Sequence, residues 1–377
     1  MTYQEKIKTA RYLARVFFEY EEGLKISEKP EELPWDFVYG MAKRHSIEAL
    51  MFEALGDMAK INAPAALYSD FSRDAAVAGA KHITQKLELE RLSRLFSENE
   101  ISYLPLKGFL IKELYKTPSL RQMTDIDIFI GNENFEKAKS LLIESGYQLD
   151  LSLEVHDCFK KPPFLEIELH KILHFDMRAF SMENTIPKGD NRYHRLMTDE
   201  DFLVFLLHHA KKHDETGGAG IRTVFDFYLV LKNKEYDEKK LCERLREENL
   251  LDFYKNIKDL IGLWFDGKEE TPELLEFELY TVTGGTYGTL ENAYLRKRKK
   301  KSGVAIMLER LFPPYSLMSS RYPVLKKCPI LLPVFYPVRF FASLFNGRVK
   351  SNVNAMNASS KKKKELKKLS KENTDKS

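Results

Sequence analysis

The run from residue 125 to residue 130 constrains the fold of this chain more than any other segment. Asp125-Ile126-Asp127-Ile128 alternates polar and apolar residues, and Phe129-Ile130 then completes a wholly apolar end. This pattern is typical of a strand in the interior of a sheet. Alternation along a strand places Asp125 and Asp127 on one face and directs Ile126 into the core. The fold must therefore contain a buried strand that carries two carboxylates two residues apart.

The segments on both sides of this strand predict the rest of a sheet. The expected elements, in chain order, are a strand over 101–106, a helix over 109–115, the strand over 125–130, a helix over 134–145 and two strand-like runs over 151–159 and 164–170. Gly146 ends the second helix, and Pro162-Pro163 lies between the last two strands. This order predicts an α+β fold built on a small mixed β-sheet.

Apolar residues recur at helical spacing outside this core, so helical regions are expected to flank the sheet. Thr198 is the expected N-cap of a helix that begins at Asp199. The expected organisation is an N-terminal helical region (1–97), the α+β core (98–195), a helical domain (196–268), a C-terminal subdomain (269–350) and a disordered basic tail (351–377).

The positive charge of the chain is concentrated in its tail. The formal net charge is +4, and residues 351–377 carry eight lysines against three acidic residues. The remaining sequence is therefore close to neutral, and the basic balance does not indicate a nucleic-acid-binding fold. The three cysteines lie far apart without a CxxC pair, which excludes a disulfide framework and a zinc ribbon and fits a cytoplasmic location.

No transmembrane segment is expected. The most membrane-like stretch, residues 329–345, is interrupted by Pro333, Pro337 and Arg339. A spanning helix needs about 20 consecutive apolar residues. The wider segment 323–345 is compatible with packing in the C-terminal subdomain or with weak contact at a membrane surface.

The two aspartates of the central strand indicate a metal site. Two adjacent carboxylates repel each other, and a divalent cation with a preference for oxygen ligands removes that repulsion. Phosphoryl transfer uses such sites to neutralise a triphosphate and to activate the attacking hydroxyl. A pair of this kind also occurs on solvated strands, so Asp125 and Asp127 alone do not define an active site.

Two further features strengthen the interpretation. Lys107-Gly108 lies at a strand-to-helix turn, where backbone N–H groups and a lysine can approach phosphate. Alternation over residues 164–170 places Glu168 and His170 on one face, and Glu168 can supply a third carboxylate. The alternatives are an ordinary turn and a solvated acidic strand face.

These motifs together resemble a known family. The matching features are Leu106-Lys107-Gly108, Tyr115, Arg121, Asp125-Ile126-Asp127, Gly146-Tyr147 and Glu168-Leu169-His170. Their order resembles an uncharacterised bacterial nucleotidyltransferase family of the DNA-polymerase-β-like superfamily. The superfamily's usual Gly-Ser is Lys-Gly here, and the spacing from Gly108 to Asp125 is longer than is common.

The resemblance implies transfer of a nucleoside monophosphate from an NTP donor to a hydroxyl-bearing acceptor, with Mg²⁺ or Mn²⁺ as cofactor. It assigns metal binding and catalysis to Asp125, Asp127 and Glu168. Nucleotide or substrate contacts fall to the residues Lys107, Gly108, Arg121, His170 and His209. For Arg121, a structural salt bridge is the alternative to a phosphate contact.

Several alternatives remain open at the level of sequence. The acceptor is a small molecule, a sugar, a protein or an RNA, and oligomeric state is not encoded in any motif. An inert nucleotide-binding scaffold with the same fold is a second hypothesis. An RNA-binding module built on the six basic residues 296–301 is a third. His208, His209 and His213 are expected to line the cleft between the helical and catalytic domains. The alternative is a zinc site at His209 and His213, which lie four residues apart on one helix face.

Overall fold

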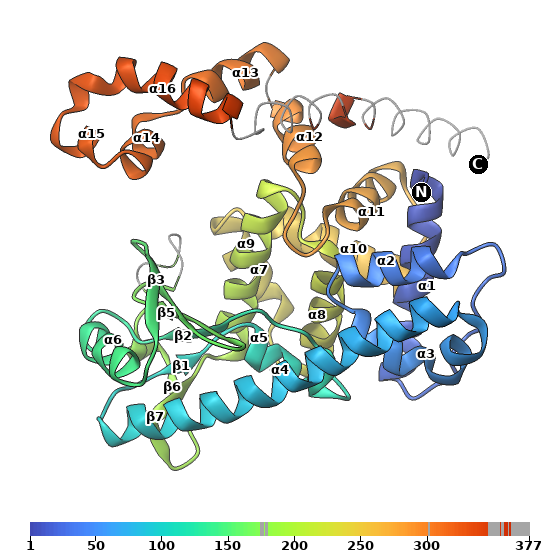
Figure 1. The fold of residues 1–377 in the computed structure, drawn as a ribbon. Coiled ribbons are helices and arrows are strands. Elements are labelled where there is room, and N and C mark those ends of the chain that lie inside the picture. Colours follow the sequence, from blue (N-terminus) through green and yellow to red (C-terminus); the bar gives the residue numbers. More distant parts are fainter. Residues whose placement is uncertain are drawn as a thin grey trace. The chain divides into compact units, whose positions relative to one another are not determined.

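The computed structural model describes residues 1–173, 177, 180–300, 302–345, 355, 358–360 and 362. The chain forms two compact units. The first comprises Met1–Lys212 and Ala219–Thr286, and the second comprises His213–Gly218 and the described residues from Tyr287 onward. The first unit combines a mixed sheet with flanking helices (Figure 1), which confirms the expected α+β class.

The sheet of the first unit has five strands. Their spatial order is β1 (Leu104–Pro105), β2 (Ile126–Phe129), β5 (Leu165–His170), β4 (His156–Lys161) and β3 (Gln148–Ser152). β2 and β5 are parallel, and the other neighbours are antiparallel. The parallel register pairs Asp127 with Glu168 and Phe129 with His170. The two strands that carry the predicted site residues are therefore direct neighbours.

The prediction of one strand over residues 151–159 was wrong. The structure divides this stretch between β3 and β4, with a turn closed by the Leu153 N–H, which donates to the His156 carbonyl at 2.9 Å. All residues of β3 are exposed. The sequence of β3 does alternate, with Leu149 and Leu151 between polar residues, but both leucines are exposed. The same alternation continues to Leu153, so the pattern does not mark the turn that separates β3 from β4.

Apolar side chains of the sheet and of the helices packed against it form the core beneath the site. Ile126 and Ile128 of β2 and Ile167 of β5 are buried there. They belong to one cluster with Leu92 of α4 (Ala65–Glu98) and Leu142 of α6 (Phe135–Glu144). Burial of each such side chain contributes about 1.5–3 kcal/mol. This packing fixes which face of β2 and β5 remains polar.

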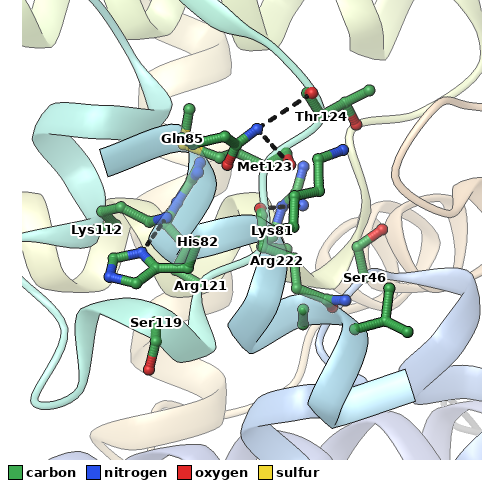
Figure 2. Close-up of a pocket in the computed structure, with 13 residues that line it drawn as sticks. Ser46, Lys81, His82, Gln85, Lys112, Ser119, Arg121, Met123, Thr124 and Arg222 are labelled. Atoms are coloured by element: carbon green, nitrogen blue, oxygen red, sulfur yellow. Dashed lines mark hydrogen bonds between the residues drawn. The ribbon is translucent and has the colours of Figure 1, made fainter. Parts of the chain in front are cut away.

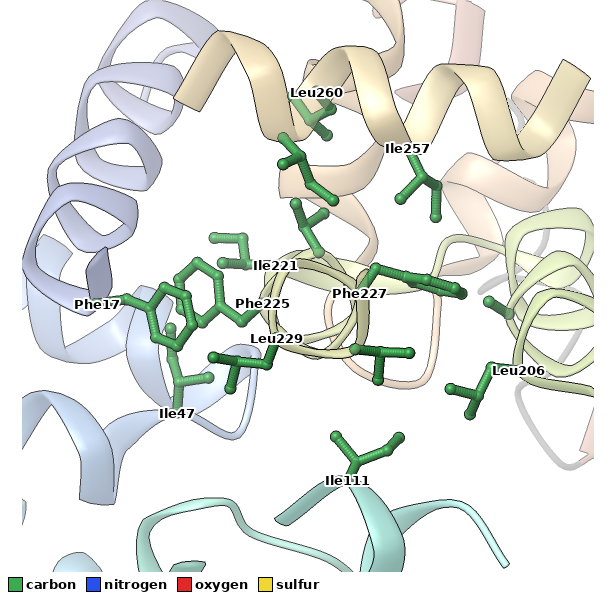
Figure 3. Packing of buried hydrophobic residues seen from close by; sticks show 14 of the residues in the cluster. Phe17, Ile47, Ile111, Leu206, Ile221, Phe225, Phe227, Leu229, Ile257 and Leu260 are labelled. Carbon is green, nitrogen blue, oxygen red and sulfur yellow. The ribbon is translucent and has the colours of Figure 1, made fainter. Parts of the chain in front are cut away.

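Helix α8 (Gly220–Asn233) is the centre of the helical core (Figure 3). Its Phe225 stacks on Phe17 of α1 (Tyr3–Glu21) with ring centroids 3.9 Å apart. Ile111 of α5 (Gly108–Lys112) belongs to the same cluster. Because α5 follows β1 directly, this contact ties the sheet to the helical core.

The other elements of this part of the chain are helical except for one hairpin. They are α2 (Trp35–Arg44), α3 (Glu48–Asn62), η1 (Pro118–Leu120), η3 (Met182–Asn184), β6 (Ile186–Lys188), β7 (Asn191–Leu196), α7 (Asp199–Thr216), α9 (Glu238–Glu247), α10 (Leu251–Phe265) and α11 (Pro272–Gly284). The Asp201 N–H donates to Thr198 Oγ1 at 3.1 Å, which confirms Thr198 as the cap of α7.

A buried histidine joins α2, α8 and α11. The Ile221 N–H donates to His45 Nδ1 at 3.0 Å, so His45 Nε2 carries the proton and donates to the Val282 carbonyl at 2.9 Å. Burial lowers the pKa of His45 to about 3, which keeps the ring neutral. Gly220 has φ +77°, and a side chain there would meet the Gly285 carbonyl oxygen at 2.6 Å. Glycine is therefore required where α8 begins.

The second unit is helical where it is described. Its elements are α12 (Leu290–Lys300), α13 (Gly303–Leu311), α14 (Tyr315–Arg321), α15 (Val324–Lys327), η4 (Pro329–Leu331) and α16 (Leu332–Phe345). Within the described residues, no helix has the length and apolar character needed to cross a bilayer. The tail predicted as disordered, 351–377, lies mostly outside the described residues, as does Lys301 of the basic run.

Candidate functional site

The neighbouring strands β2 and β5 bring three polar side chains into one group. Ligand atoms of Asp127, Glu168 and His170 all lie within 4.8 Å of one another. His170 Nε2 is 3.0 Å from Asp127 Oδ1 and 3.5 Å from Glu168 Oε2. Asp127 and His170 are buried, and Glu168 is half-buried. The parallel register creates this group, because it sets Asp127 beside Glu168 and His170 two residues further along β5.

Asp125 lies one residue before β2 and is coupled electrostatically to the group. Burial, followed by the negative charge of Asp127, raises the pKa of Asp125 to about 6. Its carboxylate is not among the ligand atoms that lie within 4.8 Å of one another. The structure thus places His170 inside the compact group and Asp125 at its edge, whereas the sequence pattern suggested two aspartates at the centre.

Lys107 neutralises Asp127. Its ammonium group donates to Asp127 Oδ1 at 2.7 Å, and this ion pair is almost fully buried. Although burial opposes ionisation of Asp127, the positive charge of Lys107 and the hydrogen bond from His170 hold the pKa of Asp127 well below its usual range. Lys107 was predicted to contact phosphate. In the structure its partner is a carboxylate of the candidate metal site.

The backbone at Lys107 is strained. Lys107 has φ +39°, a left-handed value that residues with a side chain rarely adopt. The adjacent Leu106 N–H donates to the Asp127 carbonyl at 2.9 Å, so the turn is anchored to β2. Such strain costs about 1–3 kcal/mol and persists where the surrounding structure enforces it, often at functional sites. Here the strained turn directs the lysine onto Asp127.

The group carries the charge and donors that a divalent cation requires. Asp125, Asp127 and Glu168 supply three carboxylates, against one buried ammonium from Lys107. Burial alone would lower the pKa of His170, but hydrogen bonds to Asp127 and Glu168 raise it overall. Carboxylate oxygens suit Mg²⁺ and Mn²⁺, and an imidazole nitrogen suits Mn²⁺ better than Mg²⁺. The residues present therefore fit the predicted metal.

Two further side chains belong to this face and were missed by the sequence analysis. His156, Cys158 and Glu168 form a second group with ligand atoms within 4.8 Å of one another. The His156 ring lies 4.8 Å from the His170 ring. The antiparallel register of β4 and β5 pairs Cys158 with Glu168. The alternation of residues 156–158 was visible in the sequence, but the register that brings them to Glu168 was not.

Arg121 is held by a buried carboxylate. Its Nε donates to Asp226 Oδ1 at 2.8 Å and its Nη2 to Asp226 Oδ2 at 2.7 Å. Tyr115 donates to the same Asp226 Oδ1 at 2.7 Å. This bidentate pair corresponds to the structural alternative for Arg121. It joins α8 to the segment that leads into β2.

Gly108 is explained by the approach of Arg121. A side-chain carbon at Gly108 would lie 2.9 Å from Arg121 Nη1. Arg121 Nη1 also donates to the Gly108 carbonyl at 3.4 Å. The structure thus gives Gly108 a packing role, and its predicted contact with nucleotide phosphate stays a prediction.

His208 and His209 of α7 are not members of the carboxylate group. His208 pairs with Glu248, and His209 is half-buried on the following position of the helix. His209 is absent from the two groups of three or more possible metal ligands found among the described residues. The zinc alternative at His209 and His213 therefore gains no support, and the predicted substrate contact of His209 stays a prediction.

The first unit has a mixed α+β sheet with a carboxylate cluster on two adjacent strands, next to a strand-to-helix turn. Such a cluster suits metal-dependent phosphoryl transfer. The model of a family described as uncharacterised nucleotidyltransferase matches residues 31–266. The match spans more than half of the chain, and the protein belongs to this family. Neither the curated proteins nor the solved structures contain a detectable match.

Proposed function

We propose that this protein transfers a nucleoside monophosphate from an NTP to a hydroxyl group of an acceptor, with Mg²⁺ or Mn²⁺ as the metal. The observation that supports the proposal most is the parallel pairing of β2 and β5, which brings Asp127, Glu168 and His170 into one group. The family match supports nucleotidyl transfer as the general activity.

Each residue of the group has a role on this proposal. The metal, when bound, neutralises phosphate charge and lowers the pKa of the attacking hydroxyl. Asp127 and Glu168 would hold the cation, and Asp125 would add a third carboxylate. The side chain of Glu168 is more exposed than that of Asp127, at 25% against 5%, and we assign to it the role of accepting a proton from the acceptor hydroxyl. His170 orients the Asp127 carboxylate through its hydrogen bond.

Lys107 links the metal site to the nucleotide. In the structure its ammonium group compensates the charge of Asp127. On the proposed function, the ammonium exchanges this carboxylate for a phosphate oxygen of the donor when the site is loaded. The ammonium group lies against Asp127, the carboxylate at which metal-bound phosphates of the donor would approach.

The proposal is tested by transfer of label from NTPs labelled at the α-phosphate. Purified protein is incubated with Mg²⁺ or Mn²⁺ and with pools of sugars, small hydroxyl compounds, proteins or RNA. Glu168→Gln is expected to abolish labelling of the productive pool. Glu166→Gln is the matched control, because Glu166 lies two residues away on the same face of β5 but is exposed. Equal labelling by wild type and Glu168→Gln would contradict the assignment.

A further inference from the structure

Figure 2 shows a polar pocket of the first unit, and no residue of the carboxylate group is among the residues that line it. It has a volume of about 140 Å³. Helix α4, the end of α5, the segment before β2 and the first turn of α8 supply its walls. Its lining contains the basic residues Lys81, His82, Lys112, Arg121 and Arg222 and no aspartate or glutamate. The composition of the lining favours an anionic ligand.

Lys112 is the most unusual residue of this pocket. Its side chain is buried, with 2% of its surface exposed. Its ammonium group donates to His82 Nδ1 at 2.8 Å, and among the described residues no carboxylate forms an ion pair with it. Burial, together with the charge of Arg121, lowers the pKa of Lys112 to about 8. A buried ammonium group is unfavourable unless it is paired.

The two buried lysines of this region differ in their partners. Lys107 has Asp127 as its counter-charge, whereas Lys112 has a neutral imidazole that can accept only one of its three protons. Two N–H groups of Lys112 therefore remain for another acceptor. Lys81 also lines the pocket and is half-buried. Arg121 of the lining is paired with Asp226, so its charge is compensated from outside the pocket. Lys112 and Lys81 supply positive charge to a lining that contains no aspartate or glutamate.

The pocket adjoins the candidate metal site through the backbone. Met123 and Thr124 line the pocket, and Asp125 is the next residue. Gln85 Nε2 donates to the Met123 carbonyl at 3.4 Å and to the Thr124 carbonyl at 3.3 Å, which fixes this segment against α4. Consecutive Cα atoms lie about 3.8 Å apart. A ligand in the pocket is thus within the length of a nucleotide or a small phosphate ester from Asp125.

We propose that this pocket binds a phosphate group of a substrate of the enzyme. Lys112 and Lys81 supply the charge, and His82 positions the ammonium group of Lys112. The proposal rests on the proposed function in one respect: the phosphate belongs either to the NTP donor or to a phosphorylated acceptor. Both sources share the same chemistry at the pocket.

The first test uses pyrophosphate as the probe, titrated into the full-length protein by calorimetry in the presence of EDTA. Without a divalent cation, the carboxylate group repels the probe and the basic pocket is left to bind it. Lys112→Met and Lys81→Gln are expected to weaken binding by about tenfold or more, because each removes a charge-assisted hydrogen bond. Lys86→Gln is the matched control, since Lys86 is exposed on the same helix and does not line the pocket.

The outcomes of this titration decide the proposal. Loss of binding in Lys112→Met, with an unchanged thermal midpoint or a higher one, supports it. Equal pyrophosphate affinity in wild type and Lys112→Met would overturn it, as would failure of wild type to bind pyrophosphate. A role of Lys112 confined to structure would instead lower the thermal midpoint.

A second titration separates the two sources and the two proposals. If Lys112→Met and Asp127→Asn each weaken NTP binding in the presence of Mg²⁺, the pocket is assigned to the phosphates of the donor. If NTP binding is weakened by Asp127→Asn but not by Lys112→Met, while pyrophosphate binding still needs Lys112, the pocket is assigned to a phosphorylated acceptor. Pyrophosphate binding that needs Lys112 in a protein that binds no NTP retains the anion pocket and contradicts the proposed function.

Discussion

Replacement of Lys112 by methionine is predicted to stabilise the protein at neutral pH. Burial lowers the pKa of Lys112 from 10.5 to about 8. A shift of this size corresponds to about 3 kcal/mol of unfavourable free energy for keeping the ammonium group charged in the folded state. Methionine retains a flexible apolar side chain of similar length, and the loss of the hydrogen bond to His82 opposes the gain by about 1 kcal/mol. The expected net gain is about 1–2 kcal/mol at pH 7.

The pH dependence distinguishes this explanation from a simple packing effect. Between pH 8 and pH 10.5 the unfolded chain keeps a proton on Lys112 that the folded wild type has released. Wild-type stability therefore rises with pH across this range, and the advantage of the variant disappears.

Urea unfolding at pH 7 and pH 10 measures both effects. Trp35 and Trp264, the two tryptophans of the chain, both lie in the first unit and report on it by fluorescence. Lys86→Met is the control and should change the free energy of unfolding by less than about 0.5 kcal/mol. A Lys112→Met protein that is less stable than wild type at pH 7, or an advantage independent of pH, would refute the reasoning.

Three further predictions concern a buried ion pair, a buried histidine and the C-terminal tail. Asp226→Asn leaves the buried guanidinium group of Arg121 without its counter-charge and should lower the free energy of unfolding, measured by urea titration, by about 3–5 kcal/mol. A decrease of less than about 1 kcal/mol would contradict a stabilising role of the Arg121–Asp226 ion pair. Burial lowers the pKa of His45 to about 3, so the unfolded chain binds a proton at this residue below pH 6.5 that the folded protein does not, and stability is lost as the pH falls toward 3. His45→Gln should therefore flatten the acid side of a Tm-versus-pH curve, and an unchanged curve would exclude this role. Removal of residues 355–377 should leave label transfer nearly unchanged, whereas a collapse of transfer would assign substrate binding to the tail.

The local pattern of the sequence was sufficient to predict the central strand and its polar face. Period-two alternation places Asp127 and Glu168 correctly because each strand buries one face against helices, and the hydrophobic pattern records that burial. The α+β class followed from the order of such segments. These features depend on residues close together in the chain.

Features that depend on distant residues could not be predicted. The partner of Arg121 is Asp226, 105 residues away, and no local signal connects them. Lys107 turns toward Asp127 only because the strained turn is anchored to β2. The burial of Lys112 was equally invisible, since a lysine on a short helix is usually exposed. Tertiary packing, which the local pattern does not encode, decides all three.

Binding of nucleotide at the carboxylate group is the central claim, and isothermal titration of each NTP with and without Mg²⁺ tests it most directly. Wild type is compared with a double variant in which Asp125→Asn and Asp127→Asn remove two carboxylates from one face of the strand. The predicted result is Mg²⁺-dependent binding of at least one NTP to wild type, lost in a double variant that remains folded. Binding that survives in the double variant, or no NTP binding to well-folded wild type, would contradict the account.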